Sequence, residues 1–120
     1  PPQLLFGKPQ AVAVSNRGTV FVTDVARHKV HALYLDRYTQ GFLTGADGND
    51  AYFALPMGLA VDDQKVYVVD TLSRKVSLFS LTGEQVGSYS LEDISRHYKL
   101  DVEIKFLINI LYEVILISLL

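Results

Sequence analysis

The feature of this sequence that most constrains its fold is an internal repeat. The segment VFVTDVARHKV, residues 20–30, returns at an offset of 46 residues as VYVVDTLSRKV, residues 66–76. The two copies stay in register back to Pro9 and Pro56, with a single one-residue gap in the first turn, SNRG against DDQK. A repeat of this kind indicates that the chain stacks copies of one supersecondary unit.

Each copy has the composition of short, buried β-strands. Apolar runs bounded by a proline and a turn are followed by segments rich in β-branched and aromatic residues, which pack well on a pleated surface. In the third run of each copy, apolar residues occupy both alternating faces, which favours a strand sandwiched between two layers. The expected strands cover AVAV and GLAV, TVFVTD and KVYVVD, and KVHALYL and KVSLFSL.

A fourth strand is expected in each copy, within RYTQGFLTG after the first and within GEQVGSYS after the second. QLLFGKP, near the beginning, is interpreted as the last strand of a preceding unit. Four short antiparallel strands repeated about every 45 residues are typical of the blades of a β-propeller. The sequence therefore predicts an all-β fold, a partial β-propeller of about two four-stranded antiparallel blades.

The two copies resemble NHL repeats over roughly residues 4–90. That family's pattern has a Pro-Xaa-Gly-apolar-Ala-Val opening, a strand ending in Asp, and a polar turn with Asn and Arg before an apolar strand. The positions that fit are Pro9, Ala13, Val14, Asp24 and Val30 in the first copy and Pro56, Gly58, Ala60, Val61, Asp70 and Val76 in the second. The sequence departs from this pattern at five positions: Ala11 replaces the favoured Gly, Arg27 and Ser73 replace the Asn, and Lys29 and Lys75 replace the Arg.

The resemblance implies a propeller that most often has six blades and a functionally mixed family of binding scaffolds. From it we expect a binding or scaffolding module for a protein partner, with RNA as a second possible partner and without catalysis or a cofactor. The alternative is a fragment of a metal-dependent six-bladed enzyme, of lyase or lactonase type, whose catalytic residues lie in other blades. Fold alone does not decide between these functions.

Composition narrows the class of partner only slightly. The 120 residues carry a net charge of −2 and no cysteine. The charge gives no indication of nucleic acid or of an anionic membrane, and the missing thiols exclude disulfides from this segment and leave the redox compartment open. Two blades on their own would leave sheet faces and edges uncovered, so we expect a chain of only two blades to self-associate.

The composition changes near the C-terminus, so residues 1–98 are assigned to the blades and residues 99–120 to an apolar tail. Isoleucine becomes frequent and glycine disappears in this tail. Alternating apolar residues favour a strand, polar residues spaced by four favour a helix, and a membrane span is disfavoured by Glu113. A wrong-frame tail, foreign to the propeller, is the fourth alternative.

Three groups of residues are candidates for sites. Asp24 and Asp70 end equivalent strands and are expected to cap tight turns rather than to act as ligands or acids. Arg27, His28, Lys29, Arg74 and Lys75 lie in equivalent loops and could form a basic patch for phosphates or acidic partners, or simply be solvated. The loop ADGND, residues 46–50, is interpreted as a turn rather than a calcium site, and the three histidines are too scattered to predict a metal centre.

Overall fold

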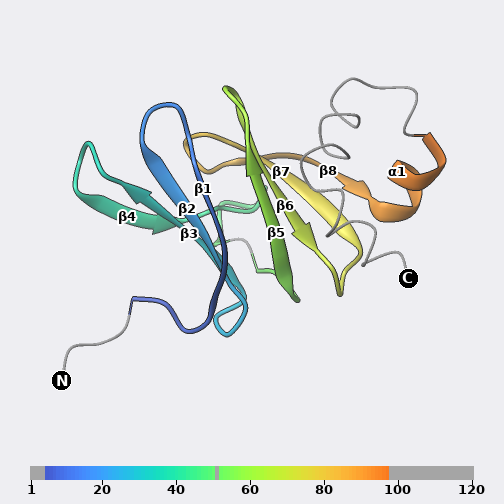
Figure 1. Cartoon of the computed structure of the whole chain (residues 1–120). Helices are drawn as coiled ribbons and strands as arrows, with labels where there is room; N and C mark the ends of the chain where they lie inside the picture. Colours follow the sequence, from blue (N-terminus) through green and yellow to red (C-terminus); the bar gives the residue numbers. More distant parts are fainter. Residues whose placement is uncertain (1–4, 51, 98–120) are drawn as a thin grey trace.

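The computed structural model describes residues 5–50 and 52–97 of the chain. Eight short strands are followed by one helix (Figure 1). The strands are β1 Pro9–Val14, β2 Thr19–Asp24, β3 Lys29–Tyr34, β4 Thr39–Phe42, β5 Pro56–Val61, β6 Lys65–Asp70, β7 Lys75–Ser80 and β8 Gln85–Ser90, and the helix is α1 Leu91–His97.

The strands form two four-stranded antiparallel sheets in the order β1-β2-β3-β4 and β5-β6-β7-β8, here called blade 1 and blade 2. Within each blade, every strand pairs with its sequence neighbours, as in the blades of a propeller. The first strands of the two blades, β1 and β5, run close together in the centre of the molecule (Figure 1). The sequence prediction of a partial β-propeller is therefore confirmed.

A hydrophobic core lies between the blades and explains why the central strands are apolar on both faces. Blade 1 contributes Phe21, Val30 and Ala32 to it. The facing residues of blade 2 and of the connection between the blades are Leu43, Phe53, Leu59, Val66, Val68 and Phe79. Burial of this apolar surface holds the two sheets face to face.

The second face of blade 2 is covered by helix α1, which the sequence pattern did not predict. Leu91 and Ile94 of the helix are buried against Tyr67, Val69 and Leu78 of the blade. The main-chain N–H of Leu91 donates to the carbonyl of Arg74, just as Phe53 donates to His28 one repeat earlier. The helix thus begins at the place where the chain would enter a further blade.

The segment before blade 1 also differs from its sequence interpretation. Residues 5–8, the described part of this segment before β1, form no strand. They are therefore not the last strand of a preceding unit. They lead into β1 in the way that residues 52–55 lead into β5. In both cases a main-chain carbonyl, that of Lys8 or of Leu55, accepts a hydrogen bond from the N–H of the residue after the strand-ending aspartate.

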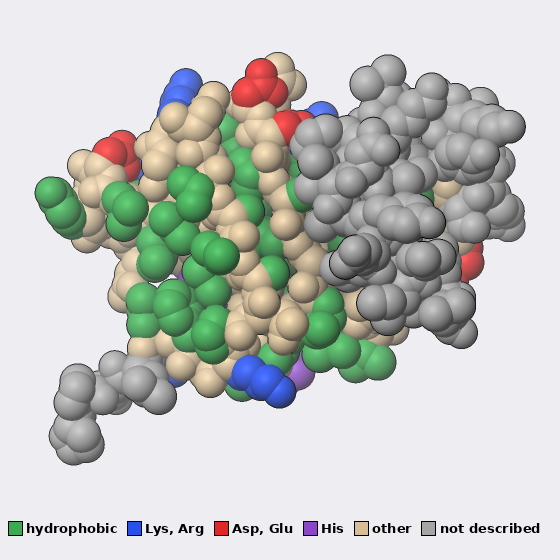
Figure 2. Space-filling model, in the orientation of Figure 1, with side chains coloured by type: hydrophobic (Ala, Val, Ile, Leu, Met, Phe, Trp, Pro, Cys, Tyr) green, Lys and Arg blue, Asp and Glu red, His purple; other side chains and the backbone are tan. Residues whose placement is uncertain are grey.

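The outward face of blade 1 is apolar and exposed, and Figure 2 shows hydrophobic side chains gathered over this blade. Val12 of β1 is 64% exposed, whereas its repeat equivalent Leu59, which faces blade 1, is 9% exposed. Within the described residues the structure contains no helix with the length and apolar character of a membrane span. The tail predicted for residues 99–120 lies outside the described residues.

A candidate binding cleft between the blades

The connection between the blades is fastened to blade 2 at both of its ends. At the first end, Thr44 N–H donates to the carbonyl of Gly83 at 2.7 Å, and Gln85 N–H donates to the carbonyl of Thr44 at 3.0 Å. At the second end, the N–H groups of Ala54 and Leu55 donate to the Asp70 carboxylate at 2.8 and 2.9 Å. The described residues between these two ends line a cleft against blade 2.

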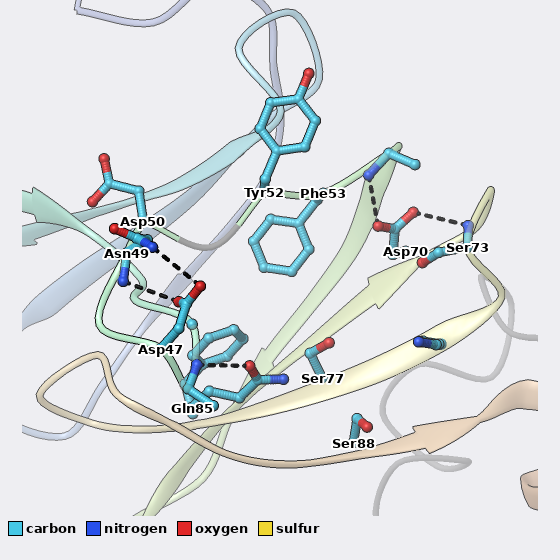
Figure 3. A pocket seen from close by; sticks show the side chains of 15 residues that line it. Asp47, Asn49, Asp50, Tyr52, Phe53, Asp70, Ser73, Ser77, Gln85 and Ser88 are labelled. Carbon is cyan, nitrogen blue, oxygen red and sulfur yellow. Dashed lines mark hydrogen bonds between the residues drawn. The ribbon is translucent and has the colours of Figure 1, made fainter.

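The cleft has a volume of about 690 Å³, which is within the usual range for ligand sites. Figure 3 shows the ring of Phe53 pointing into it, Asp47 and Asn49 on the connection, and Ser77 and Ser88 on the opposite side. Ser77 belongs to β7 and Ser88 to β8, and the two residues are paired across these strands. The lining is therefore aromatic at the centre and polar at the edges.

The cleft exists because the two repeats differ at one pair of positions. In blade 1, His31 of β3 pairs with Phe42 of β4, and their rings lie 5.1 Å apart. The ring of Phe6 packs edge-on against His31 at 4.7 Å and completes this aromatic cluster. In blade 2 the paired positions are Ser77 and Ser88. Two large rings are thus replaced by two small hydroxyl side chains, and the volume that blade 1 fills is open in blade 2.

The strand-ending aspartates lie beneath these equivalent positions, and both are buried. Asp24 accepts hydrogen bonds from the main-chain N–H groups of Gly7 and Lys8 at 2.8 and 2.9 Å, and from Arg27 at 3.2 Å. It also contacts His31, whose Nε2 lies 2.8 Å from Oδ2. Each aspartate therefore holds its own turn and, in addition, ties the incoming segment to the blade.

Asp70 makes the same main-chain bonds without the fourth partner. Its carboxylate accepts from Ala54, Leu55 and, at 3.3 Å, from Ser73. Asp70 lines one end of the cleft and is 3% exposed. No side chain among the described residues contacts it in the way His31 contacts Asp24.

The connection contributes the exposed carboxylates of the cleft. The main-chain N–H and the side-chain amide of Asn49 donate to Asp47 and hold the pKa of that carboxyl below its usual range. Asp50 accepts from Lys29 Nζ at 3.0 Å, on the rim. Asp47 is therefore ionised at neutral pH and available as a hydrogen-bond acceptor. The loop predicted from the sequence as a turn forms one wall of the cleft.

Two residues of the predicted basic patch, Arg27 and His28, contact neighbouring main chain. Arg27 donates through a guanidinium nitrogen to the carbonyl of Leu5. His28 Nδ1 lies 3.0 Å from the carbonyl oxygen of Phe53, and the imidazole stacks on Tyr52 at 5.0 Å. His28 thus ties the turn of blade 1 to the connection and, through Tyr52, to the edge of the cleft.

The other residues of the predicted patch fall in different surroundings. Lys29 pairs with Asp50 and lies over the ring of Phe42 at 4.3 Å. Arg74 forms an ion pair with Glu92 of α1. Lys75 lines the cleft, and it forms no ion pair with a described residue. Most of the positive charge on these loops is therefore already engaged within the chain.

The described residues of the cleft offer groups for hydrogen bonding and stacking. No group of three histidine or carboxylate side chains within residues 5–50 and 52–97 could hold a metal ion. Of the described histidines, His28 contacts main-chain carbonyls and His31 contacts Asp24, and neither is hydrogen bonded to a cleft serine. Hydroxyls, an amide, carboxylates and aromatic faces are present for hydrogen bonding and stacking.

Sequence reasoning missed the serines that open the cleft. Ser77 and Ser88 stand at the 46-residue offset from His31 and Phe42, so both mismatches are visible in the sequence, but only the strand pairing shows that they lie side by side. A comparison of the repeats position by position, with volumes in mind, would have indicated the site. The sequence singles out the loop at residues 46–50, but it does not indicate that this loop lies across the cleft from Ser77 of β7 and Ser88 of β8.

Comparison with known proteins supports the fold. No model of a protein family matches the sequence, and no curated protein matches it. Among solved structures, the chain is similar to a selenomethionine-substituted virginiamycin B lyase from Staphylococcus aureus, with a TM-score of 0.55 and 18% sequence identity. The match covers 69% of this chain and 27% of the lyase chain, so the likeness spans about a quarter of that protein. That structure is a β-propeller, and at this identity the similarity establishes the propeller fold of the two blades and nothing of their activity.

Proposed function

We propose that this chain is a propeller binding module of the NHL-repeat kind, and that it recognises a protein partner at the cleft between its blades. The observation that carries the proposal is the cleft itself, of about 690 Å³, at positions where the other repeat is filled by His31 and Phe42. A blade needs no such opening, because blade 1 closes it with its own side chains. The loops and connections of a propeller are the usual places for recognition.

A protein partner is favoured over RNA by the placement of charge. RNA binding depends on basic groups that are free to neutralise phosphates. Here Arg74 pairs with Glu92, and Lys29 pairs with Asp50. The cleft itself is lined by Asp47 and Asp50 on one wall, which would repel a phosphate backbone.

A second candidate is an enzyme of lyase or lactonase type whose catalytic residues lie in blades outside this sequence. The name of the lyase with a similar structure is what favours it, and 18% identity carries the fold alone. Metal-dependent lyase or lactonase turnover by the complete protein would favour this candidate over the binding module.

The proposal is tested by selecting partners against a blocked cleft. The full 120-residue chain is immobilised and exposed to a random peptide library and, separately, to a random RNA pool. The variant Ser88→Phe, which copies the residue of blade 1, serves for counter-selection. We expect peptides that the natural chain retains and the variant releases. Retention of RNA alone, lost on changing Arg74 and Lys75 to Ala, would overturn the proposal.

A further inference from the structure

We propose that the end of the cleft at Asp70 binds a planar, cationic N–H donor, namely the imidazolium or guanidinium group of a histidine or arginine side chain of the partner. This inference rests on the proposed function, because it names the chemical group that the cleft would accept. It comes from the comparison of the two blades within the same chain.

Blade 1 shows how such a group is held, because it carries one of its own. His31 is 3% exposed, and its Nε2 lies 2.8 Å from Oδ2 of Asp24. Its ring meets the face or edge of two phenylalanines, Phe6 at 4.7 Å with the planes 88° apart, and Phe42 at 5.1 Å. A buried carboxylate at one end and aromatic rings along the sides thus enclose an imidazole.

Blade 2 repeats the carboxylate and one of the two aromatic rings, without the imidazole and with Ser88 in place of Phe42. Asp70 occupies the position of Asp24, is equally bound by main-chain N–H groups, and is 3% exposed. Phe53 occupies the position of Phe6 and points into the cleft (Figure 3). Ser77 replaces His31, and no hydrogen bond joins its side chain to Asp70. The carboxylate and the aromatic ring therefore remain, while the group between them in blade 1 is supplied by no described residue.

The groups at the Asp70 end of the cleft determine which chemical class of ligand can bind there. A buried carboxylate can accept more hydrogen bonds than the three it receives from the main chain, and its charge favours a cationic donor over a neutral one. Imidazolium and guanidinium are flat and stack or meet edge-on with a phenylalanine ring, which an ammonium group on a flexible stem does less well.

The rest of the cleft leaves room for the chain that carries this group. Its volume of about 690 Å³ exceeds what one side chain fills, so flanking peptide can lie along the connection. Three charged groups besides Asp70 line the cleft: Asp47, Asp50 and Lys75. Asp50 is engaged by Lys29, so Asp47 is the remaining acceptor for a second donor of the ligand. Lys75 on the rim favours an acceptor or a carboxylate next to the cationic residue.

The experiment uses blocked single amino acids as probes of the full chain. N-acetylhistidine methylamide, N-acetylarginine methylamide and N-acetylphenylalanine methylamide are titrated at pH 6, and binding is followed by the backbone amide signals of Ser77, Ser88 and Phe53 in NMR spectra. We expect the histidine and arginine probes to bind at this end of the cleft and the phenylalanine probe to bind at least tenfold more weakly. Equal binding of all three probes would overturn the inference.

Two variants locate the site. Ser77→His supplies the imidazole from the chain itself and is expected to abolish binding of both cationic probes. Asn16→His, on an exposed turn of blade 1, adds the same side chain away from the cleft and should leave binding unchanged. Undiminished binding by the Ser77→His variant would place the probes elsewhere and contradict the proposal.

Raising the pH tests whether binding depends on the charge of the probe or only on its shape. Above pH 7 the histidine probe loses its charge, since the ordinary pKa of histidine is about 6.5. Its affinity should fall at least fivefold, while that of the arginine probe, which stays charged, should be constant. Unchanged affinity of the histidine probe would contradict the need for a cation.

The peptide selection distinguishes this inference from the proposed function. Selected peptides that bind in the cleft but lack histidine and arginine would refute this inference and leave the proposed function standing. The absence of any selected peptide would refute the proposed function.

Discussion

His31 and Ser77 occupy the same position in successive blades, and only His31 reaches the aspartate of its blade, with Nε2 2.8 Å from Oδ2 of Asp24. This one difference decides whether the buried carboxylate has a side-chain partner within its own blade. In blade 1 the buried carboxylate has an internal partner and the surface is closed, whereas in blade 2 the carboxylate lies at the end of an open cleft.

Replacing the aspartates by asparagine should destabilise blade 1 more than blade 2. Asp24→Asn weakens three charge-assisted main-chain bonds and the contact with His31, at a cost of about 2–4 kcal/mol in the free energy of unfolding. Asp70→Asn weakens main-chain bonds only, and should cost about 1–3 kcal/mol. Urea unfolding followed by circular dichroism measures both. A larger loss for Asp70→Asn would contradict the assigned role of His31.

Acid should weaken the fold through Asp24. Burial by itself would raise the pKa of this carboxyl, but hydrogen bonds from Lys8, Gly7, His31 and Arg27 outweigh it and hold the pKa well below the ordinary 3.8. Because the pKa is lower in the folded than in the unfolded chain, the stabilisation is complete above about pH 5 and is lost as the pH falls toward the folded value.

This pH dependence is measured as the urea midpoint between pH 7 and pH 3. The midpoint should fall over the acidic part of that range, and the fall should be smaller in Asp24→Asn, which has no carboxyl to protonate. Parallel curves for the natural chain and the variant would show that other carboxyls cause the acid sensitivity.

Much of the fold was predictable because the same strand pattern occurs twice in the sequence. The matched strands, the strand-ending Asp24 and Asp70, and the two-sided apolar patterns of β3 and β7 all follow from local alternation and composition. The helix α1 was not predictable in this way, because its buried contacts Leu91 and Ile94 lie in a short segment where the repeat pattern simply ends. Its position depends on the uncovered face of blade 2, which is a tertiary effect.

The site was less accessible from sequence than the fold. The loops of Arg27 and Arg74 were found as equivalent, and their left-handed residues His28 and Arg74 have the same φ of 57°. Sequence reasoning could not show that Arg74 is engaged by Glu92, because that pair joins separate elements. The cleft depends on two serines brought together by strand pairing and on a connection held over them, neither of which is a local signal.

Exchanging the paired residues of the blades should have opposite effects. Phe42→Ser removes a ring from the cluster with His31 and should cost about 1–3 kcal/mol, since the phenylalanine is only partly buried. Ser88→Phe adds a ring where the cleft has room and should leave the thermal midpoint unchanged or raise it. A strongly destabilised Ser88→Phe variant would mean that the cleft is too small for the ring that blade 1 accommodates.

Helix α1 should contribute to the stability of blade 2. Leu91 is fully buried against Tyr67 and Val76, so Leu91→Ala should cost about 2–4 kcal/mol. Val86→Ala, at a side chain that is 56% exposed on β8, is the control and should cost less than about 1 kcal/mol. Equal and small losses in thermal or urea unfolding would show that the helix does not pack as a cover of the blade.

The exposed face of blade 1 should drive association between copies of this chain. Val12 and Val14 are 64% and 58% exposed on β1, on the face where a propeller blade normally meets its neighbour. Val12→Lys should therefore shift sedimentation toward the monomer without lowering the unfolding midpoint. Leu59→Lys, at the equivalent and buried position of blade 2, should instead destabilise the fold by several kcal/mol, because it places a charge in the core between the blades. A natural chain that sediments as a monomer at all concentrations, or a Val12→Lys variant that associates as before, would contradict the assignment of this face.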